Sequence, residues 1–509
     1  MEQARSGQAA TALAALPVAL LLAPQHAAVL NRAAELCAAC NAWSEEQHCR
    51  ARAEAAGTHL AALERAVRAE QAGELDEARE GFDQAIAAKP ADPAAWVGAV
   101  RLERKRGQNQ AAQALLARAL NLLPDNPDLL VEAAEIDLFH GRQADAAARL
   151  EAAFAAGLAD PWMHRRYLQL LNGIGEYRKL IVHRATLTPI PGTADAFHAD
   201  MLAGHARLAL HYDEATLIAQ AQQREASPRF LSHTAVRDRL AGAIAARQPF
   251  AVVRLGDGEG RFLAFLDPAL NALMSAEERR CVGQSIWSNW FAADLSNTWN
   301  AQLINLGESL ARSLTESDVI GLPLAGRLKI DHFHRGYLGY LDSYVGKLLT
   351  DHQSIATADA FINIALHQLS PFCADLLTGQ DFVGVVSPHP GLAARLASHL
   401  AIPTHQDWLI PGETRLPDRP GLARGVGHFP ERYITLMDEL KLPYRGAVVL
   451  VAAGLLGKIY CARVKALGGI AIDIGSVVDA WMGFATRPGQ YQPASAWQLP
   501  VACLTPPQP

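Results

Sequence analysis

The sequence is poor in charged residues and has no excess of basic ones. Only 19% of its 509 residues are Asp, Glu, Lys or Arg, whereas half are hydrophobic. Such a composition excludes an intrinsically disordered chain, and the length suggests two or more globular domains. The formal net charge is −6 and the chain contains no basic run. Nucleic acid is therefore not expected as a partner, because binding its phosphates requires clustered Lys and Arg.

Long hydrophobic runs and a disulfide framework are also missing. The most apolar N-terminal stretch, residues 13–23, contains Pro17 and is too short to span a bilayer. We therefore expect neither a transmembrane helix nor a signal peptide. The seven cysteines are odd in number and scattered along the chain, which favours reduced thiols in a cytoplasmic protein over disulfide bonds.

One group of cysteines is spaced closely enough to suggest zinc. It comprises Cys37, Cys40, His48 and Cys49, residue types that zinc accepts as ligands. The alanine-rich surroundings favour another interpretation, in which small buried cysteines pack between helices. We prefer packing, with zinc as the alternative.

The first 225 residues contain a repeat instead. Glycine, alanine and proline each recur at intervals of 34 residues, at Gly73, Gly107, Gly141 and Gly175, at Ala78, Ala112 and Ala146, and at Pro93, Pro127 and Pro161. This is the period of tetratricopeptide repeats, whose helical hairpins have glycine at the turn, alanine where the helices touch and proline at the boundary. A weaker copy of the pattern extends to residue 19, so we expect about six hairpins.

Stacked hairpins of this kind form a solenoid whose concave face usually binds a peptide or another protein. The repeat pattern of residues 1–225 supplies no clustered catalytic side chains. We therefore expect this domain to bind a protein partner, and a purely structural or oligomerising stack is the alternative.

A different pattern begins after residue 225. Short apolar runs alternate with helix-like stretches up to residue 489, and the clearest of these runs are residues 250–253, 318–323, 382–387, 447–452 and 468–473. This alternation predicts a Rossmann-like α/β domain with a mostly parallel sheet. The predicted fold is thus an N-terminal α-solenoid, an α/β domain at 226–489, and a Pro/Gln-rich tail at 490–509 that frays.

The first apolar run of the α/β domain leads into an acidic loop that is rich in glycine. Gly256, Gly258 and Gly260 allow a tight turn and close approach of a ligand. Asp257 and Glu259, two residues apart, can bind one Mn²⁺ or Mg²⁺ ion, which in turn holds the oxygens of a diphosphate. The alternative is an ordinary solvated turn, because Gly and Asp favour turns.

The segment Arg254-Leu-Gly-Asp-Gly-Glu259 resembles the Arg-aromatic-Gly-Asp-Gly-Glu signature of the GT-D glycosyltransferases. The resemblance implies that the Asp-x-Glu pair binds a metal and a nucleotide sugar, while Leu255 stands where an aromatic residue is usual. Residues 449–481 are similar to the closing strand, helix and strand of that family, with its Asp-Ile-Gly ending. Ser476 stands where His is frequent. The likeness spans roughly residues 230–485 and leaves the repeats unexplained.

Ligands of parallel α/β sheets bind at the carboxyl ends of the strands. This rule gathers a set of candidate residues on one rim of the sheet, namely Asp257, Glu259, Pro323, Ser387, His389, Gly454, Lys458 and Asp473. Lys458 follows a glycine loop that is not a Walker loop, because Ile459 replaces the required Ser or Thr. Its ammonium group either reaches a phosphate or extends from the helix into solvent.

A polar cluster follows the run at 318–323. It contains Arg327, Lys329, Asp331, His332, His334 and Arg335. A three-histidine metal site would need His332, His334 and a third histidine, but no helical HExxH spacing supports one. We interpret the cluster as phosphate or sugar contacts, and plain surface is the alternative.

These residues predict a metal-dependent glycosyltransferase that uses a nucleoside-diphosphate donor, expected to be UDP-linked, and a protein acceptor bound by the repeats. Asp257 and Glu259 are expected to hold Mn²⁺ or Mg²⁺ and, with Asp473, to serve catalysis. Substrate contacts are expected from Arg254, Gly256, Gly258, Pro323, Arg327, Ser387, His389, Gly454, Lys458 and Asp479. The base for the acceptor is open among Asp473, Asp479 and a histidine of residues 331–335. The alternative function is a repeat-protein adaptor whose α/β domain binds a partner or a nucleotide without turnover.

Overall fold

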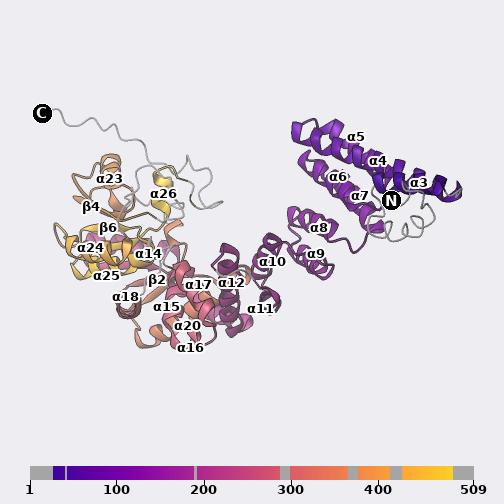
Figure 1. The fold of residues 1–509 in the computed structure, drawn as a ribbon. Helices are drawn as coiled ribbons and strands as arrows, with labels where there is room; N and C mark the ends of the chain where they lie inside the picture. The colour runs from indigo at the N-terminus through magenta and orange to yellow at the C-terminus, as the bar shows by residue number, and fades with distance from the viewer. Residues whose placement is uncertain are drawn as a thin grey trace. The chain divides into compact units, whose positions relative to one another are not determined.

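The computed structural model describes residues 27–39, 43–188, 192–286, 299–364, 376–412, 427–484 and 486. The chain forms two compact units, Met1–Leu170 and Leu171–Pro509, and Figure 1 colours the ribbon along the sequence. Residues 13–23, Cys40 and the tail at 490–509 lie outside the described residues, so the expectations for them stay predictions.

The helices of the first unit follow the 34-residue pattern. They are α3 (Ala27–Ala39), α4 (Trp43–Ala72), α5 (Leu75–Ala88), α6 (Pro93–Lys105), α7 (Asn109–Leu122), α8 (Pro127–Phe139), α9 (Gln143–Ala155) and α10 (Pro161–Gly173), the last of which crosses into the second unit. Gly73, Gly107 and Gly141 follow helices with φ between 73° and 83°, a left-handed conformation that favours glycine. Prolines begin α6, α8 and α10, where a missing backbone N–H is tolerated. The tetratricopeptide-like architecture predicted from the sequence is confirmed.

Helix α4 departs from the pattern because it runs unbroken for 30 residues. The residue 34 positions before Pro93 is His59, so no proline ends the helix there. His59 is buried instead, with its ring nitrogens 2.9 Å from the Ala85 carbonyl oxygen and 2.7 Å from Asp92 Oδ2. Two neighbouring hairpins therefore share one long helix.

Two cysteines of the first unit, Cys37 and Cys49, are part of its packing. Cys37 and Cys49 are both buried and form one apolar cluster with Ala33 and Ala34. The packing interpretation accounts for these two residues.

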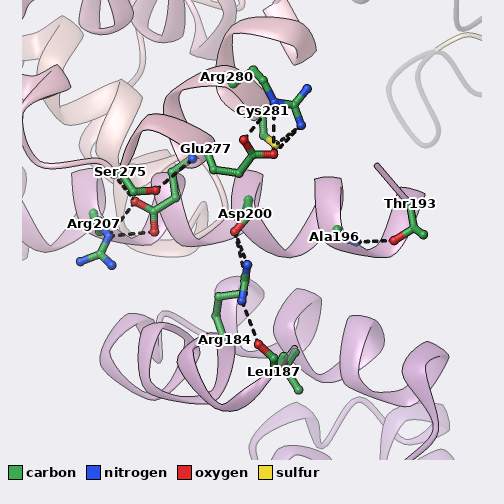
Figure 2. A network of polar contacts seen from close by, with 11 residues as sticks. Arg184, Leu187, Thr193, Ala196, Asp200, Arg207, Ser275, Glu277, Arg280 and Cys281 are labelled. Carbon is green, nitrogen blue, oxygen red and sulfur yellow. Dashed lines mark hydrogen bonds and ion pairs between the residues drawn. The ribbon is translucent and has the colours of Figure 1, made fainter. Parts of the chain in front are cut away.

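The second unit begins with the last helices of the repeat, α11 (Tyr177–Thr186), α12 (Ala194–His211) and α13 (Glu214–Glu225). Figure 2 shows Arg184 of α11 paired with Asp200 of α12, at 2.6 Å. Arg207 of α12 pairs with Glu278 of α17 (Ala276–Ile286) at 2.9 Å. The division between the two compact units falls after residue 170, and the end of the repeat domain expected at residue 225 stays a prediction.

A seven-stranded parallel sheet forms the core of the second unit. Its strands are β1 (Phe250–Arg254), β2 (Val319–Leu322), β3 (Ala356–Asp359), β4 (Phe382–Ser387), β5 (Thr404–Leu409), β6 (Val448–Val451) and β7 (Ile470–Asp473). They lie in the order β3-β2-β1-β7-β6-β4-β5, and every neighbouring pair is parallel. The predicted parallel sheet is confirmed, and all its carboxyl ends lie along one edge.

Helices cover both faces of the sheet, which explains why its inner strands are continuous apolar runs. Helices α14 (His233–Ala245), α23 (Leu392–Leu400) and α26 (Val477–Trp481) share one apolar core with the strands. Helix α25 (Gly457–Ala466) packs on β1 and β7 outside that core, together with α18 (Trp299–Thr315). The remaining helices include α15 (Asp257–Leu266), α16 (Pro268–Asn271), α19 (Ala325–Ile330), α20 (Arg335–Asp351) and α24 (Tyr433–Glu439). Among the described helices, none has both the length and the apolar character needed to cross a membrane.

Candidate active site

A buried network of four charges lies at the carboxyl ends of β1 and β7. Lys458 Nζ, in the first turn of α25, lies 2.6 Å from Glu259 Oε1 and 3.1 Å from Asp473 Oδ2. It also donates to the Gly454 carbonyl oxygen at 3.0 Å, so three partners surround the three donors of the ammonium group. Arg254 adds the second cation, with Nε 3.7 Å from Asp473 Oδ1. Two cations and two carboxylates thus compensate one another in the protein interior.

The network keeps Lys458 charged although its side chain is almost fully buried. Burial alone would lower the pKa of Lys458, but the negative charges of Asp473 and Glu259 outweigh burial and raise this pKa above its ordinary value. The expected contact of Lys458 with a phosphate therefore competes with two carboxylates that already hold it.

Protein groups also hold the guanidinium of Arg254. Its Nη1 donates to the Ala360 carbonyl oxygen at 2.9 Å and to Asn363 Oδ1 at 3.0 Å. Its backbone N–H donates to Asp473 Oδ2 at 3.2 Å. Gly475, in the Asp-Ile-Gly segment, has φ +53°, and a β-carbon there would overlap Arg254 Nη2. Arg254 therefore ties together the ends of β1, β3 and β7.

This contact gives a direct test of the role of Gly475. We expect Gly475→Ala to lower the free energy of unfolding by about 2–4 kcal/mol, since it adds overpacking to an unfavourable left-handed conformation. The matched control is Gly379→Ala, because Gly379 has φ +81° and open space around its Cα; it should lose only about 1–2 kcal/mol. Urea denaturation of both variants measures the difference, and equal losses would show that Arg254 does not need Gly475.

The acidic segment expected as a loop is helical from Asp257 onward. Glu259 accepts the backbone N–H of Gly256 with Oε2 at 2.8 Å, a bond that caps the start of α15. Gly258 and Gly260 are buried within the helix, and a β-carbon at Gly260 would overlap the backbone of Tyr337 in α20. Residues two apart on a helix do not face the same side. Glu259 therefore joins the buried network, whereas Asp257 does not.

Asp257 lies instead beside the polar cluster that follows β2. Its Oδ2 is 3.6 Å from His334 Nε2 and its Oδ1 is 3.8 Å from Arg327 Nη2. Asp331 organises these partners, since its Oδ1 lies 2.9 Å from His334 Nδ1 and its Oδ2 accepts from Arg327 Nε at 3.2 Å. The side chain of Asp257 is 32% exposed. The structure thus joins two predicted residues, Asp257 and Arg327, to a dyad of Asp331 and His334.

Both carboxylates of this cluster are held in their charged form. Burial would raise the pKa of Asp257, but His334, Arg261 and Arg327 outweigh burial and lower it below its ordinary value. For Asp331, burial acts in the same direction, yet the hydrogen bond and charge of His334, together with Arg327, lower the pKa to about 2.

The low pKa of Asp331 predicts how its contribution to stability depends on pH. Its folded-state pKa of about 2 lies below the ordinary value of 3.8, so its contribution is present above the ordinary pKa and disappears as the pH falls towards 2. We expect the difference in unfolding free energy between wild type and Asp331→Asn to shrink steadily as the pH falls below about 4. Denaturant unfolding at a series of pH values measures this difference, and one that does not change with pH would contradict the assignment.

A third group of predicted residues lies between β4 and α26. His389 Nε2 is 2.7 Å from Asp479 Oδ1, and the His389 backbone N–H donates to Ser387 Oγ at 3.1 Å. Ser387 and His389 are each 1% exposed, and Phe484 stacks on the imidazole ring. Among the other predicted residues, Pro323 accepts a hydrogen bond from Arg224 and Gly454 accepts one from Lys458.

Asp200, Glu277 and Cys281 form another cluster of metal-ligand types, with ligand atoms within 4.8 Å of one another. Figure 2 shows the arginine partners of both carboxylates, Arg184 at 2.6 Å from Asp200 and Arg280 at 2.6 Å from Glu277. Burial raises the pKa of Cys281 to about 11, so its thiol is protonated in the absence of a metal ion. We therefore interpret this cluster as a polar connection between α12 and α17.

Comparisons with known proteins found no matching family and only distant structural neighbours. No family model matches the chain, and no curated protein does. Among solved structures, the MamA protein matches at 16% identity and a TM-score of 0.25, over 29% of this chain and 80% of its own. PilW, a type IV pilus biogenesis factor, matches at 19% identity and a TM-score of 0.24, over 38% and 92%. A mutant O-GlcNAc transferase from Thermobaculum terrenum matches at 12% identity and a TM-score of 0.23, over 84% and 77%.

TM-scores this low do not indicate a shared activity. The helical period, the positive-φ glycines and the sheet order are properties of this chain itself. They define a tetratricopeptide-like repeat protein with a parallel α/β domain.

Proposed function

We propose that this protein is a metal-dependent glycosyltransferase that moves a sugar from a nucleoside-diphosphate donor, UDP-linked, to a protein acceptor. The position of Asp257 carries the proposal. It begins α15 shortly after the inner strand β1, at the edge of the sheet where such folds bind ligands, and it is partly exposed beside His334 and Arg327. The likeness of residues 254–259 to the GT-D signature supports the same assignment, and the repeats support a protein acceptor.

Asp257 is the member of the Asp-x-Glu pair that fits a divalent cation. Its oxygens approach neighbouring cationic or imidazole groups no closer than 3.6 Å in the ion pairs it makes, whereas both oxygens of Glu259 have partners within 2.8 Å. Mg²⁺ and Mn²⁺ commonly bind one or two protein carboxylates together with substrate phosphates. The cation, when bound, would neutralise charge on the departing diphosphate.

His334 is the base that we propose for the acceptor hydroxyl. Asp473 is held by Lys458 and Arg254, and Asp479 is held by His389. Asp331 fixes Nδ1 of His334, while Nε2 lies 3.6 Å from Asp257, too far for a hydrogen bond. A carboxylate that fixes one imidazole nitrogen orients the other for proton transfer. We further propose that Arg327 contacts the anionic donor with a charge-assisted hydrogen bond.

The full-length protein allows a direct test. Purified protein is incubated with a panel of nucleoside-diphosphate sugars, with Mn²⁺ or with EDTA, and release of the nucleoside diphosphate is followed. We expect slow release of UDP that requires Mn²⁺ and accelerates when the physiological acceptor is added. Absence of release from every donor in the panel would contradict the proposal.

The four-charge network favours a second candidate function. Arg254, Glu259, Lys458 and Asp473 bind one another, so these residues could be retained to hold the fold of a non-catalytic adaptor. Calorimetry with UDP and Mn²⁺ separates the two. Failure of UDP to bind under any metal would favour the adaptor, whereas saturable binding would favour the enzyme.

A further inference from the structure

The segment between β2 and α20 is held by helices of the repeat. This segment carries Arg327, Asp331 and His334, the residues that surround Asp257. At its start, Arg224 of α13 donates to the Pro323 carbonyl oxygen at 2.7 Å, and Glu225 accepts the Ala325 backbone N–H at 2.6 Å. At its end, Tyr177 of α11 donates to the His332 carbonyl oxygen. All three contacts are made with main-chain atoms, and main-chain atoms determine the path of the segment.

Buried charges strengthen this attachment. Arg224 forms an ion pair with Asp342 of α20, and their side chains are 10% and 8% exposed. Arg335, at the start of α20, pairs with Glu214 of α13 at 2.7 Å. Separating α13 from α20 would leave Arg224 and Asp342 without their partners, which is strongly unfavourable for buried ions.

Glycines bring the same helices into close contact. A β-carbon at Gly336 would lie 2.7 Å from the backbone nitrogen of Ala209 in α12, and one at Gly339 would lie 2.7 Å from Leu217 in α13. Both distances are shorter than a normal van der Waals contact, so larger side chains would push α20 away. Helices α12 and α13 therefore form the surface on which α20 rests.

We propose that Arg224 and Glu225 are positioning residues, through which the last repeat hairpin places Asp331 and His334 relative to Asp257. The consequence for catalysis rests on the function proposed above. Glu225 acts on the turn of chain that precedes Arg327, and it does not itself contact the reacting groups. Its loss is therefore expected to lower kcat while the KM for the donor stays unchanged.

The experiment uses three variants of the full-length protein. Glu225→Ala removes the acceptor of the Ala325 N–H, Glu225→Gln keeps an oxygen at the same place, and Gln223→Ala is an exposed control on the same helix. Hydrogen exchange is followed by mass spectrometry over residues 323–335, together with UDP release in Mn²⁺. For Glu225→Ala we expect exchange to become about tenfold faster throughout 323–335 and kcat to fall about tenfold, the factor for loss of one hydrogen bond. Both other variants should behave as wild type.

Two results would overturn the inference. One is faster exchange confined to the turn around Ala325, because residues 331–335 would then keep their positions without Glu225. The other is an unchanged kcat despite faster exchange throughout the segment. A wild type that releases no nucleotide would contradict the proposed function alone, because exchange over 331–335 still decides whether Glu225 positions this segment.

Discussion

Lys458→Met should lower the free energy of unfolding of the second unit by about 3–5 kcal/mol, the range for removing one partner of a buried ion pair. Methionine has a similar length but no charge. Glu259 and Asp473, which are 6% and 3% exposed, would lose their shared cation. Asp473 would retain Arg254 at 3.7 Å, so most of the loss should come from Glu259. Urea denaturation, followed by a signal from the second unit, measures the effect.

Two further variants keep this prediction testable. Lys347→Met, on the exposed side of α20, is the matched control and should change the unfolding free energy by less than about 0.5 kcal/mol. Lys458→Met combined with Glu259→Gln should be more stable than Lys458→Met alone, because the uncompensated carboxylate is removed. A loss below about 1 kcal/mol for the single variant would show that the charges of this buried network do not depend on one another.

The repeat was predictable from sequence because backbone geometry dictates its residues. A left-handed turn after a helix favours glycine, as at Gly107 and Gly141, and a helix start tolerates proline, as at Pro127. Helix α4 is unbroken because His59, and not a proline, stands 34 positions before Pro93. The packing boundary at residue 170 was not predictable, because it depends on which surfaces α12 and α13 contact.

Two strands escaped prediction because they lack the signal that marks the others. Strand β5 is an edge strand whose residues Thr404, His405 and Gln406 are exposed, so it contains no apolar run. Strand β3, at the opposite edge, has the sequence Ala-Thr-Ala-Asp and contains no large apolar side chain. The inner strands are apolar because helices cover both of their faces.

The sequence placed charged residues at the correct strand ends but did not determine their partners. The adjacency of β1 and β7 brings Arg254 close to Asp473, and the helical start at Asp257 turns Glu259 towards Lys458. Because side chains two residues apart on a helix point in different directions, Glu259 joins the buried network and Asp257 stays outside it. The dyad of Asp331 and His334 was seen only as part of a polar cluster, although its spacing of three residues across a helix start was a usable signal.

Asp257→Asn should lower the activity strongly while leaving the stability of the fold nearly unchanged. We expect Mn²⁺-dependent UDP release to fall about a thousandfold, because charge stabilisation by a bound metal is worth several kilocalories per mole and each 1.4 kcal/mol is about tenfold in rate. The free energy of unfolding should change by less than about 1 kcal/mol, since Asp257 is 32% exposed and its ion pairs are long. Asp238→Asn, on the exposed surface of α14, is the matched control for both measurements.

Glu259→Gln should show the opposite pattern. Glu259 bonds to the Gly256 N–H and to Lys458 in the interior, so its neutral replacement should destabilise the fold by about 1–3 kcal/mol, the penalty for leaving a buried polar group unsatisfied. Turnover by the fraction that remains folded should fall less than in Asp257→Asn, because Glu259 is bound to Gly256 and Lys458, whereas Asp257 is the proposed metal ligand. If both variants lost activity equally with unchanged stability, the two carboxylates would have to act together on the metal. The side-chain arrangement seen here would then have to change when the donor binds, with Glu259 released from Lys458.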